Sequence, residues 1–388
     1  MTTSPLACAQ CGAQLLPDQR ICPACRALQP TREAFAPRAT IERGGTRLVI
    51  DSKLGEGGMG VVWRAWRFHP PGTPLAATPE PLALKVLRPS AMQRPGGAGV
   101  RELFLREADA LRRLSHPNIV AFHDLFEHEG SLVLVLEYVE GETLDAVISR
   151  HVARARLAGG GGLPGMPLLR AWFYFQQLLG ALAAIHAMGM IHRDVKPSNV
   201  LVRKDGLVKL GDFGIVRFAG APSSAATAEL ELGTGAYMSP EQVLSQPIDL
   251  RSDLYSAAIV LYEMLAGRPP FSADRPEFLV RKDQVDATPP SIRLFLPQAP
   301  FVLDALFQRA LAKNPAQRFG SAIEMGNAFR GALAIPETPE WQAQADIASA
   351  ARAMGDPRLP ESGVQQKKMA TLREFVVSGY KTKKMSAV

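Results

Sequence analysis

The sequence predicts a two-lobed α+β protein, in which a small antiparallel β lobe with one helix precedes a larger helical lobe. Short β-rich runs are concentrated between about residues 46 and 138, and helical spacing dominates after Tyr138. A separate small segment is expected before the β lobe, because all 4 cysteines of the chain lie within its first 25 residues. The chain therefore divides into a cysteine-rich start, two lobes and a polar tail.

Composition is that of an ordinary soluble protein, with 388 residues, 47% hydrophobic and 21% charged, and a net charge of +7. We expect no membrane span, because the strongest apolar run, Ala257–Tyr262, is far shorter than the roughly 18 residues required. Residues 1–11 lack the basic and apolar regions of a secretory signal, so we expect a cytoplasmic protein with reduced thiols. Much of the basic excess lies near the end of the chain, at Lys367, Lys368, Lys381, Lys383 and Lys384. Such a cluster predicts a solvated end, and weak attraction to anionic lipid or nucleic acid is the alternative.

The cysteines form two Cys-x-x-Cys pairs, Cys8 with Cys11 and Cys22 with Cys25. Two such turns can close a tetrahedral thiolate shell around Zn²⁺, and a closed shell is structural rather than catalytic. Two disulfides or a redox-active pair are the alternatives; a cytosolic setting disfavours the first, and the second lacks a surrounding βαβ pattern. We predict a zinc ribbon over residues 1–28, which resembles those at the ends of regulatory proteins.

The segments that follow are expected in a fixed order. Residues 29–45 are rich in proline and glycine and predict a linker, and 336–388 predict a polar tail that is partly helical or disordered. Strands are expected at Arg47–Ile50, Gly60–Ala65, Leu82–Leu87 and Leu132–Tyr138. Helices are expected at Glu102–Leu114, Leu168–Met188, Asp253–Ala266 and Phe301–Lys313, and in the tail at Trp341–Met354.

A glycine-rich loop lies between the first two strands. Gly55, Gly57 and Gly60, followed by Val62, fit the pattern G-x-G-x-x-G-x-V, whose backbone can approach phosphates closely. A dinucleotide-binding loop is the alternative, but such a loop opens a helix. Val61-Val62-Trp63 instead predicts a strand after the glycines.

A lysine follows in the next strand. Alternation places Ala83 and Lys85 on one face of Leu82–Leu87. A lysine on the inner face of an apolar strand is costly unless it pairs with a phosphate or a carboxylate, and the alternative is that its side chain extends to solvent. Glu107, on the following helix, is the expected carboxylate, and Glu102 is the alternative.

Two stretches in the second lobe predict phosphoryl-transfer chemistry. His192 to Asn199 carries a candidate proton acceptor (Asp194), a phosphate-binding lysine (Lys196) and a metal-binding amide (Asn199) on one loop. Asp212-Phe213-Gly214 begins 13 residues after Asn199, and it supplies a carboxylate for the same cation. The long motif followed by the short one at this spacing is the most specific signal in the chain.

From about residue 46 to 335 the chain resembles the protein kinase catalytic domain, especially the bacterial eukaryotic-like serine/threonine kinases. The resemblance implies the bilobal protein-kinase fold over 46–335. Besides the motifs above, it is carried by Ser115–Val120, Glu137–Val139, Gly233-Thr234, Tyr237–Glu241, Ser252–Ser256, Gly267–Phe271 and Asn314–Phe319.

The resemblance also implies cofactors and roles. ATP would bind with Mg²⁺ or Mn²⁺, and the γ-phosphate would pass to Ser or Thr hydroxyls of protein substrates. The catalytic group would be Asp194, Lys196, Asn199, Lys85 and Glu107, with Asn199 and Asp212 as the Mg²⁺ ligands. Nucleotide would contact Gly55, Gly57, Gly60, Val62, Ala83, Lys85, Glu137, Val139 and Leu201, with Leu136 as gatekeeper.

The resemblance also implies which residues regulate the enzyme and which charged residues stabilise the larger lobe. Arg193, before the catalytic aspartate, suggests control by phosphorylation between Asp212 and Glu241, with Thr227 as the favoured site and Thr234 in the substrate platform. The alternative is that the hydroxyls of this stretch are incidental. Three charged residues would be structural: Glu241 with Arg318 as a buried ion pair, and Asp253 as the anchor of the catalytic loop.

Two rival functions remain to be separated from a kinase. A pseudokinase scaffold or signalling adaptor would lack the phosphoryl-transfer residues, which are all present here. A nucleic-acid-binding protein would need a basic ribbon, but only Arg20 and Arg26 lie near it. The expected partners are protein substrates, a protein bound by the ribbon, and a second copy through the kinase domain; nucleic acid is not expected.

Overall fold

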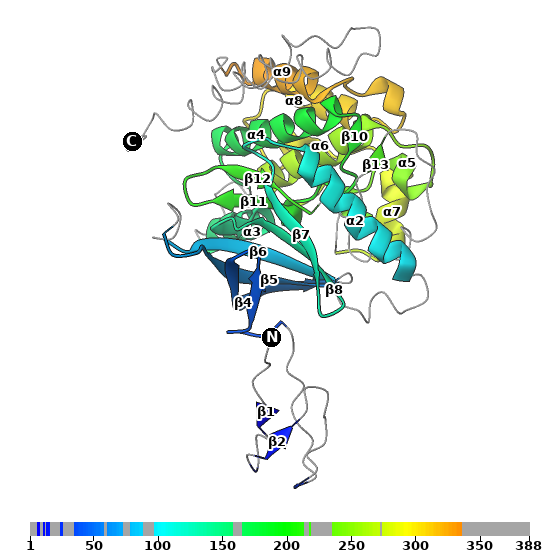
Figure 1. The fold of residues 1–388 in the computed structure, drawn as a ribbon. Helices are drawn as coiled ribbons and strands as arrows, with labels where there is room; N and C mark the ends of the chain where they lie inside the picture. Colours follow the sequence, from blue (N-terminus) through cyan, green and yellow to red (C-terminus); the bar gives the residue numbers. More distant parts are fainter. Residues whose placement is uncertain are drawn as a thin grey trace, which may run out of the picture.

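The computed structural model describes residues 35–335, except 58–59, 73–77, 88–96, 158–164, 213–216, 219–234 and 272–273. Near the amino terminus it describes residues 6–7, 11, 13–15 and 24–25. Within these ranges a β-rich lobe and a helical lobe lie one behind the other along the chain, and Figure 1 shows the sheet at one end and α8 and α9 at the other. The two-lobed α+β architecture is confirmed.

The smaller lobe is an antiparallel sheet of six strands in the order β3-β4-β5-β6-β8-β7. Its strands are β3 Thr40–Arg43, β4 Thr46–Gly57, β5 Gly60–Phe68, β6 Glu80–Leu87, β7 Phe122–His128 and β8 Ser131–Glu137. The glycine-rich sequence lies where β4 turns into β5, with Gly57 paired to Gly60. A strand on both sides of the glycines confirms the strand-loop-strand prediction.

The sheet begins earlier than the sequence indicated, because residues 29–45 are not a linker throughout. Ile41 on β3 is buried, and β3 pairs with β4. Gly44 and Gly45 form the two-residue turn between them, with φ of 55° and 79°. Two consecutive positive φ values define a tight hairpin turn that matches strand twist. These glycines therefore close a hairpin, although by composition alone they resemble a flexible connection.

The alternation predicted for β6 is confirmed. Leu82, Leu84 and Val86 are buried in the core of the sheet lobe, whereas Ala83 and Lys85 are only half-buried on the other face. This second face is the one that carries the charged site. The helix α2, Gly97–Arg113, follows β6 in the chain. Leu103 and Leu111 on this helix and Leu114 directly after it, the three leucines expected on an inner face, are buried.

The larger lobe is organised around two buried helices, α4 Leu168–Ala187 and α6 Leu250–Ala266. Around them are α3 Leu144–Leu157, α5 Pro240–Val243, α7 Glu277–Asp286, α8 Phe301–Ala310 and α9 Ala322–Ala332. The larger lobe also has short strands, which flank the loops that carry Asp194 and Asp212. They are β9 Gly141–Thr143, β10 Met190–Ile191, β11 Val200–Arg203, β12 Val208–Leu210 and β13 Arg217–Phe218.

The predicted bounds of the helices need correction. α2 spans Gly97–Arg113 instead of Glu102–Leu114, and α4 ends at Ala187 instead of Met188. α6 begins at Leu250, because the Asp249 side chain accepts a hydrogen bond from the Arg251 N–H and caps the helix. Gly267 ends α6 with a φ of 73°, a conformation that favours glycine. α8 ends at Ala310, three residues before the predicted end at Lys313.

The prediction that no segment is long and apolar enough to cross a membrane needs correction. Within the described residues, α4 meets that criterion of length and hydropathy. However, 61% of its apolar 18-residue stretch is buried inside the protein. Its leucines, alanines, isoleucine and phenylalanines raise its hydropathy, although Arg170, Gln176 and Gln177 interrupt the apolar residues. Ala171, Phe175, Leu179 and Leu182 belong to the buried core, as expected for the central helix of a folded lobe.

A small hairpin precedes the sheet lobe. β1 Leu6–Ala7 pairs antiparallel with β2 Gln14–Leu15, with Ala7 opposite Gln14. The first cysteine pair lies in the connection between these strands. Cys11 and Cys25 are exposed, and Cys8 and Cys22 lie outside the described residues.

Candidate active site

The catalytic loop runs from the end of β10 to the short 3₁₀ helix Pro197–Asn199. Asp194 Oδ2 accepts a hydrogen bond from Asn199 Nδ2 at 2.8 Å and lies 2.8 Å from Lys196 Nζ. Asp194 Oδ1 is buried and has no hydrogen-bond partner among the described residues. One carboxylate oxygen is thus fixed, and the other is left without a partner among the described residues.

Asp253 of α6 holds this loop in place. Its carboxylate accepts hydrogen bonds from the backbone N–H groups of His192 and Arg193, each at 2.8 Å. His186 Nε2 lies 2.8 Å from the same carboxylate. Burial opposes the charged form, but these contacts outweigh it and lower the pKa of Asp253. The anchoring role expected of Asp253 agrees with this geometry.

The backbone of the loop is held in an uncommon conformation. Arg193 has a φ of 70°, and its carbonyl oxygen accepts a hydrogen bond from Gln242 Nε2 at 2.8 Å. Asp212 has a φ of 58°. Non-glycine residues reach this region only where their surroundings impose it, and such residues cluster at functional sites. Here, Asp253 and Gln242 hold Arg193 from both sides.

Lys85 joins the two lobes. Its Nζ lies 2.8 Å from Glu107 Oε1 on α2 and 2.5 Å from Asp212 Oδ1. Burial disfavours the charged lysine, but Asp212 and Glu107 outweigh it and raise the pKa of Lys85. The Lys85 ammonium in turn lowers the pKa of Asp212. Of the two carboxylates considered for Lys85, Glu107 is the partner, because Glu102 pairs with Arg106 instead.

The side chains suited to a metal ion are Asn199 and Asp212. Asn199 makes its hydrogen bonds to Asp194 through Nδ2, so Oδ1 is the atom left to bind a cation. The Asp212 side chain is exposed, so a ligand can reach it beside Lys85. Amide and carboxylate oxygens are the ligands that Mg²⁺ prefers. The donor set therefore fits a divalent cation.

The apolar side chains predicted to contact a nucleotide are only partly buried. Val62, Ala83, Leu136 and Leu201 are half-buried. Strand pairing puts Val62 opposite Lys85 and Ala83 opposite Leu136. Gly55 has open space where a side chain would project. These observations fit a planar apolar group with phosphates attached.

Gly60 has a different constraint from the one suggested by its motif. A Cβ atom at this position would lie 1.9 Å from the Val86 carbonyl oxygen. The residue must therefore be glycine to let β5 and β6 approach, whatever binds above the loop.

Sequence reasoning missed the role of Lys209 on β12. Its buried ammonium lies 2.7 Å from Glu137 Oε2, at the end of β8. The Glu137 carboxylate also accepts a hydrogen bond from the Ala121 N–H at 3.1 Å. A lysine between Val208 and Leu210, in an apolar strand, needs an anionic partner. This position in the sequence could therefore have predicted that Lys209 forms an ion pair. The pair ties the strand leading to Asp212 to the junction of the lobes.

The ion pair expected to brace the larger lobe is present. Arg318 donates to both carboxylate oxygens of Glu241, at 2.7 and 2.8 Å, and both side chains are buried. Ser239 caps α5 in a capping box with Gln242. This serine therefore contributes to the segment before Glu241 rather than weakening it.

Several predicted residues lie outside the described part of the chain. They are Phe213, Gly214, Thr227, Gly233 and Thr234. Their predicted roles stay predictions.

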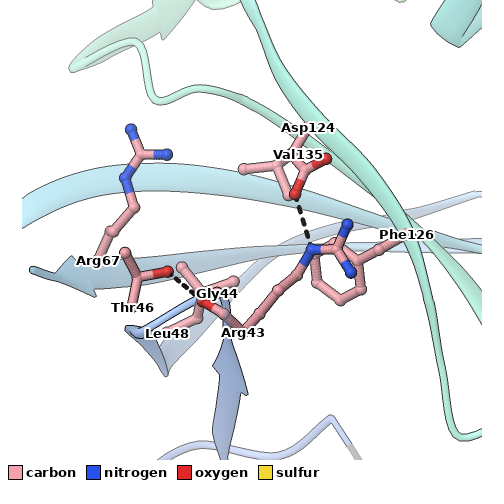
Figure 2. Close-up of a pocket in the computed structure, with 8 residues that line it drawn as sticks. All are labelled: Arg43, Gly44, Thr46, Leu48, Arg67, Asp124, Phe126 and Val135. Carbon is pink, nitrogen blue, oxygen red and sulfur yellow. Dashed lines mark hydrogen bonds and ion pairs between the residues drawn. The ribbon is translucent and has the colours of Figure 1, made fainter.

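A pocket of about 380 Å³ lies elsewhere on the sheet lobe, lined by Arg43, Asp124, Phe126 and neighbouring residues (Figure 2). Arg43 Nε donates to Asp124 Oδ2 at 2.8 Å, and the guanidinium lies over the Phe126 ring. Phe126 and Val135, which also lines the pocket, belong to the core on the Leu84 side of the sheet. Lys85 projects from the other face, so this pocket is separate from the charged site.

Comparison with known proteins gives consistent results. A sequence model for the protein kinase domain matches residues 48–327. The serine/threonine-protein kinase PknL of Mycobacterium tuberculosis is 35% identical over 295 residues, covering 75% of this chain and 68% of PknL. The serine/threonine-protein kinase PknD of the same organism is 36% identical over 286 residues, covering 73% of this chain but only 39% of PknD.

The same similarity is found among solved structures. The crystal structure of the M. tuberculosis PknI kinase domain has 28% sequence identity and a TM-score of 0.56. The match covers 78% of this chain and 100% of that domain.

Proposed function

The chain belongs to the protein kinase family, as an ATP-dependent serine/threonine protein kinase, and on that premise we propose how its own residues carry out the transfer. The observation that carries the proposal is the Asp194 carboxylate, whose Oδ2 is held by Asn199 and Lys196 while the buried Oδ1 lacks a partner. In this proposal, Oδ1 accepts the hydrogen bond of the substrate Ser or Thr hydroxyl and orients its oxygen toward the γ-phosphate.

Asn199 and Asp212 would hold Mg²⁺ or Mn²⁺ through oxygen atoms, and the cation would neutralise charge on the phosphates when bound. Lys85 is positioned for the α- and β-phosphates, because Glu107 fixes its ammonium from the α2 side. Lys196 supports the γ-phosphate from the catalytic loop. These residues mainly position the reactants and offset negative charge, since phosphoryl transfer requires little covalent participation by the protein.

The adenine ring is proposed to lie between Val62 and Ala83 on one side and Leu201 on the other, with Leu136 behind it. The half-burial of these side chains supports this position. The backbone of Glu137 and Val139 would contact the polar edge of the ring. Because Lys209 and Ala121 hold the Glu137 carboxylate, the backbone at this point is fixed before nucleotide binds.

Regulation by phosphorylation between Asp212 and Glu241 remains part of the proposal, with Thr227 as the favoured site and Thr234 in the substrate platform. Arg193 would bind the added phosphate. The support is the position of Arg193 next to Asp194, in a backbone held by Asp253 and Gln242. Phosphopeptide mapping tests it: modification at Thr227 supports loop control, and full activity of Thr227→Ala contradicts it.

A structural Zn²⁺ bound by Cys8, Cys11, Cys22 and Cys25 is proposed for the start of the chain. The β1–β2 hairpin supports it, because the turn between these strands carries the first Cys-x-x-Cys pair. Elemental analysis of the full chain tests it, with one Zn²⁺ per chain expected and none in a Cys8→Ser, Cys11→Ser variant. A metal-free wild type with full stability contradicts the site.

Steady-state kinetics of labelled phosphate transfer test the residue roles. We compare Lys85→Met and Asp212→Asn with Asp205→Asn, a control whose carboxylate pairs with Arg203 on a surface turn. The first two are expected to lose at least about 100-fold in kcat/KM for ATP, because each removes a charge contact to the phosphates or the cation. The control should match the wild type. Transfer at the wild-type rate in Asp212→Asn contradicts the assignment.

A further inference from the structure

The inner face of α7 carries a buried polar side chain that the proposed mechanism does not use. α7 buries two residues, Val280 and Gln284, which lie one helical turn apart. Gln284 is completely buried. A buried amide adds little to stability beyond what an apolar side chain would give, but its hydrogen bonds fix the groups that it contacts. The partners of Gln284 therefore indicate what it positions.

The Gln284 side chain joins α6 to the segment before α5. Its Nε2 donates a hydrogen bond to the Ala236 carbonyl oxygen at 2.6 Å and a weaker one to the Gly235 carbonyl oxygen at 3.4 Å. Its Oε1 accepts a hydrogen bond from the Tyr255 hydroxyl of α6 at 2.6 Å. Only the NH₂ group can donate to carbonyl oxygens, so these contacts determine which way the amide points.

The backbone at the end of α7 is held as well. Lys313 Nζ donates to the carbonyl oxygens of Asp283 at 3.1 Å and Gln284 at 2.7 Å. A cation is favourable at this end of a helix, where carbonyl oxygens lack partners within the helix. The same ammonium lies 4.5 Å from the centroid of the Phe271 ring. Gln284 is thus fixed through its main chain as well as its side chain.

The segment that Gln284 holds is the 3₁₀ helix Gly235–Tyr237, here called the 235–237 segment. α6 holds it from the other side. Ser256 Oγ donates to the Tyr237 carbonyl oxygen at 2.7 Å, and the Tyr237 hydroxyl donates to Glu263 Oε2 at 2.6 Å. Contacts from α6 and α7 together therefore set the position of this short stretch of backbone.

The 235–237 segment leads directly to the catalytic loop. It is followed by α5, in which Gln242 Nε2 donates to the Arg193 carbonyl oxygen at 2.8 Å. Arg193 is the residue before Asp194. Figure 1 shows α5 and α7 close together, and the two helices are in contact. A continuous series of contacts thus runs from Gln284 to the residue next to the catalytic carboxylate.

A protein substrate must extend beyond Asp194, because an extended chain advances about 3.3 Å for each residue on either side of the accepting hydroxyl. The proposed function puts Thr234 in the substrate platform, and Thr234 directly precedes the 235–237 segment. The neighbours of the phosphorylated residue are therefore expected on this backbone. A displacement of about 1 Å in such a surface is enough to misplace the hydroxyl and slow transfer.

We propose that Gln284 is a positioning residue for the protein substrate, because it holds the 235–237 segment where the residues beside the phosphorylated Ser or Thr bind. Its contacts are with this segment and with α6, so it acts through them and not on ATP. The inference rests on the proposed function. It adds that α7 controls the KM for the protein substrate independently of the nucleotide site.

Two rates of the full chain test the inference. One is transfer from labelled ATP to the serine peptide that the wild type phosphorylates fastest in a peptide array, and the other is hydrolysis of ATP by water. Gln284→Met keeps the length of the side chain but cannot donate to Ala236. Its KM for the peptide should rise at least about tenfold, because a buried carbonyl loses its partner and the 235–237 segment loosens. Its KM for ATP and its hydrolysis rate should stay within about twofold of the wild type.

Two further variants complete the comparison. Gln308→Met is the matched control, since Gln308 is exposed on α8 and should leave both rates unchanged. Tyr255→Phe keeps the ring over which the Arg318 guanidinium lies, and removes only the hydroxyl that orients the Gln284 amide. It should raise the KM for the peptide about two- to fivefold.

A peptide KM equal to that of the wild type in Gln284→Met would overturn the inference. A fall of transfer and hydrolysis by the same factor would also overturn it, because a purely structural role lowers both rates together. If Gln284→Met does not fold, Tyr255→Phe decides, and an unchanged peptide KM overturns the inference. A wild type that transfers no phosphate to any peptide contradicts the proposed function itself, and the positioning role falls with it.

Discussion

The ion pair between Lys209 and Glu137 provides a sharp prediction about the junction of the lobes. Lys209→Met keeps the length and apolar stem of the side chain but removes the ammonium. The Lys209 and Glu137 side chains are 8% and 25% exposed, and their charged atoms are 2.7 Å apart. The change therefore leaves a mostly buried carboxylate whose remaining contact is the Ala121 N–H.

The expected cost follows from this geometry. Breaking a fully buried pair costs about 3–5 kcal/mol. Glu137 is partly hydrated and keeps one hydrogen bond, so we expect a loss of about 2–3 kcal/mol in the free energy of unfolding. For a domain of this size the loss corresponds to a fall of about 5–10 °C in Tm. The KM for ATP should rise as well, because the backbone of Glu137 is proposed to contact adenine.

The chain offers a matched control in Lys204→Met. Lys204 pairs with Glu140, but both side chains are exposed. Solvent screens an exposed pair, so its loss should leave Tm nearly unchanged. Urea unfolding and thermal melting of both variants provide the comparison.

Double-mutant cycles separate the pair from other effects of substitution. Lys209→Met with Glu137→Gln should give a coupling energy of about 1–3 kcal/mol, and Lys204→Met with Glu140→Gln close to zero. A loss in Lys209→Met no larger than in Lys204→Met would refute the reasoning, since burial would then have made no difference.

Three further predictions concern the core of each lobe. Arg318→Met should lower the free energy of unfolding by about 3–5 kcal/mol in urea titrations, because Glu241 would stay buried without its cation; a loss below 1 kcal/mol contradicts this. Burial raises the pKa of Glu263 to about 7, so the folded protein should lose stability as pH rises from about 4.5 to 7, and Glu263→Gln should remove that slope in unfolding curves at pH 5 and 8. Gly60→Ala should prevent normal pairing of β5 with β6, because its Cβ would meet Val86 O, and circular dichroism melting should show a strongly lowered Tm; a wild-type Tm contradicts the clash.

Part of the site was predictable because a charged residue in an apolar strand lowers stability unless a partner of opposite charge lies nearby. Lys85 in an apolar strand required a carboxylate, and Glu107 is that carboxylate. Ala83 and Lys85 lie on the same face of β6 because side chains alternate along any strand, whatever the fold. The role of Asp253 as anchor of the catalytic loop was implied only by the resemblance to protein kinases, and both N–H contacts are present.

What could not be predicted depends on tertiary contacts. β7 has the sequence Phe-His-Asp-Leu-Phe-Glu-His, whose polar residues do not predict a strand. The strand forms at the edge of the sheet, where it pairs with β8. Gly44 and Gly45 have the composition of a linker, and only the pairing of β3 with β4 makes them a hairpin turn. No local pattern shows that Lys209 meets Glu137, because 72 residues separate them.

Phosphate transfer from labelled ATP by the full chain, compared with Asp194→Asn, tests the central claim most directly. The substitution keeps the shape of the side chain but replaces the carboxylate that Asn199 and Lys196 hold. We predict label on Ser or Thr in the wild type, mapped by mass spectrometry, and a loss of at least about 100-fold in rate with ATP binding retained in the variant. Transfer by Asp194→Asn at the wild-type rate would contradict the claim that this carboxylate orients the substrate hydroxyl.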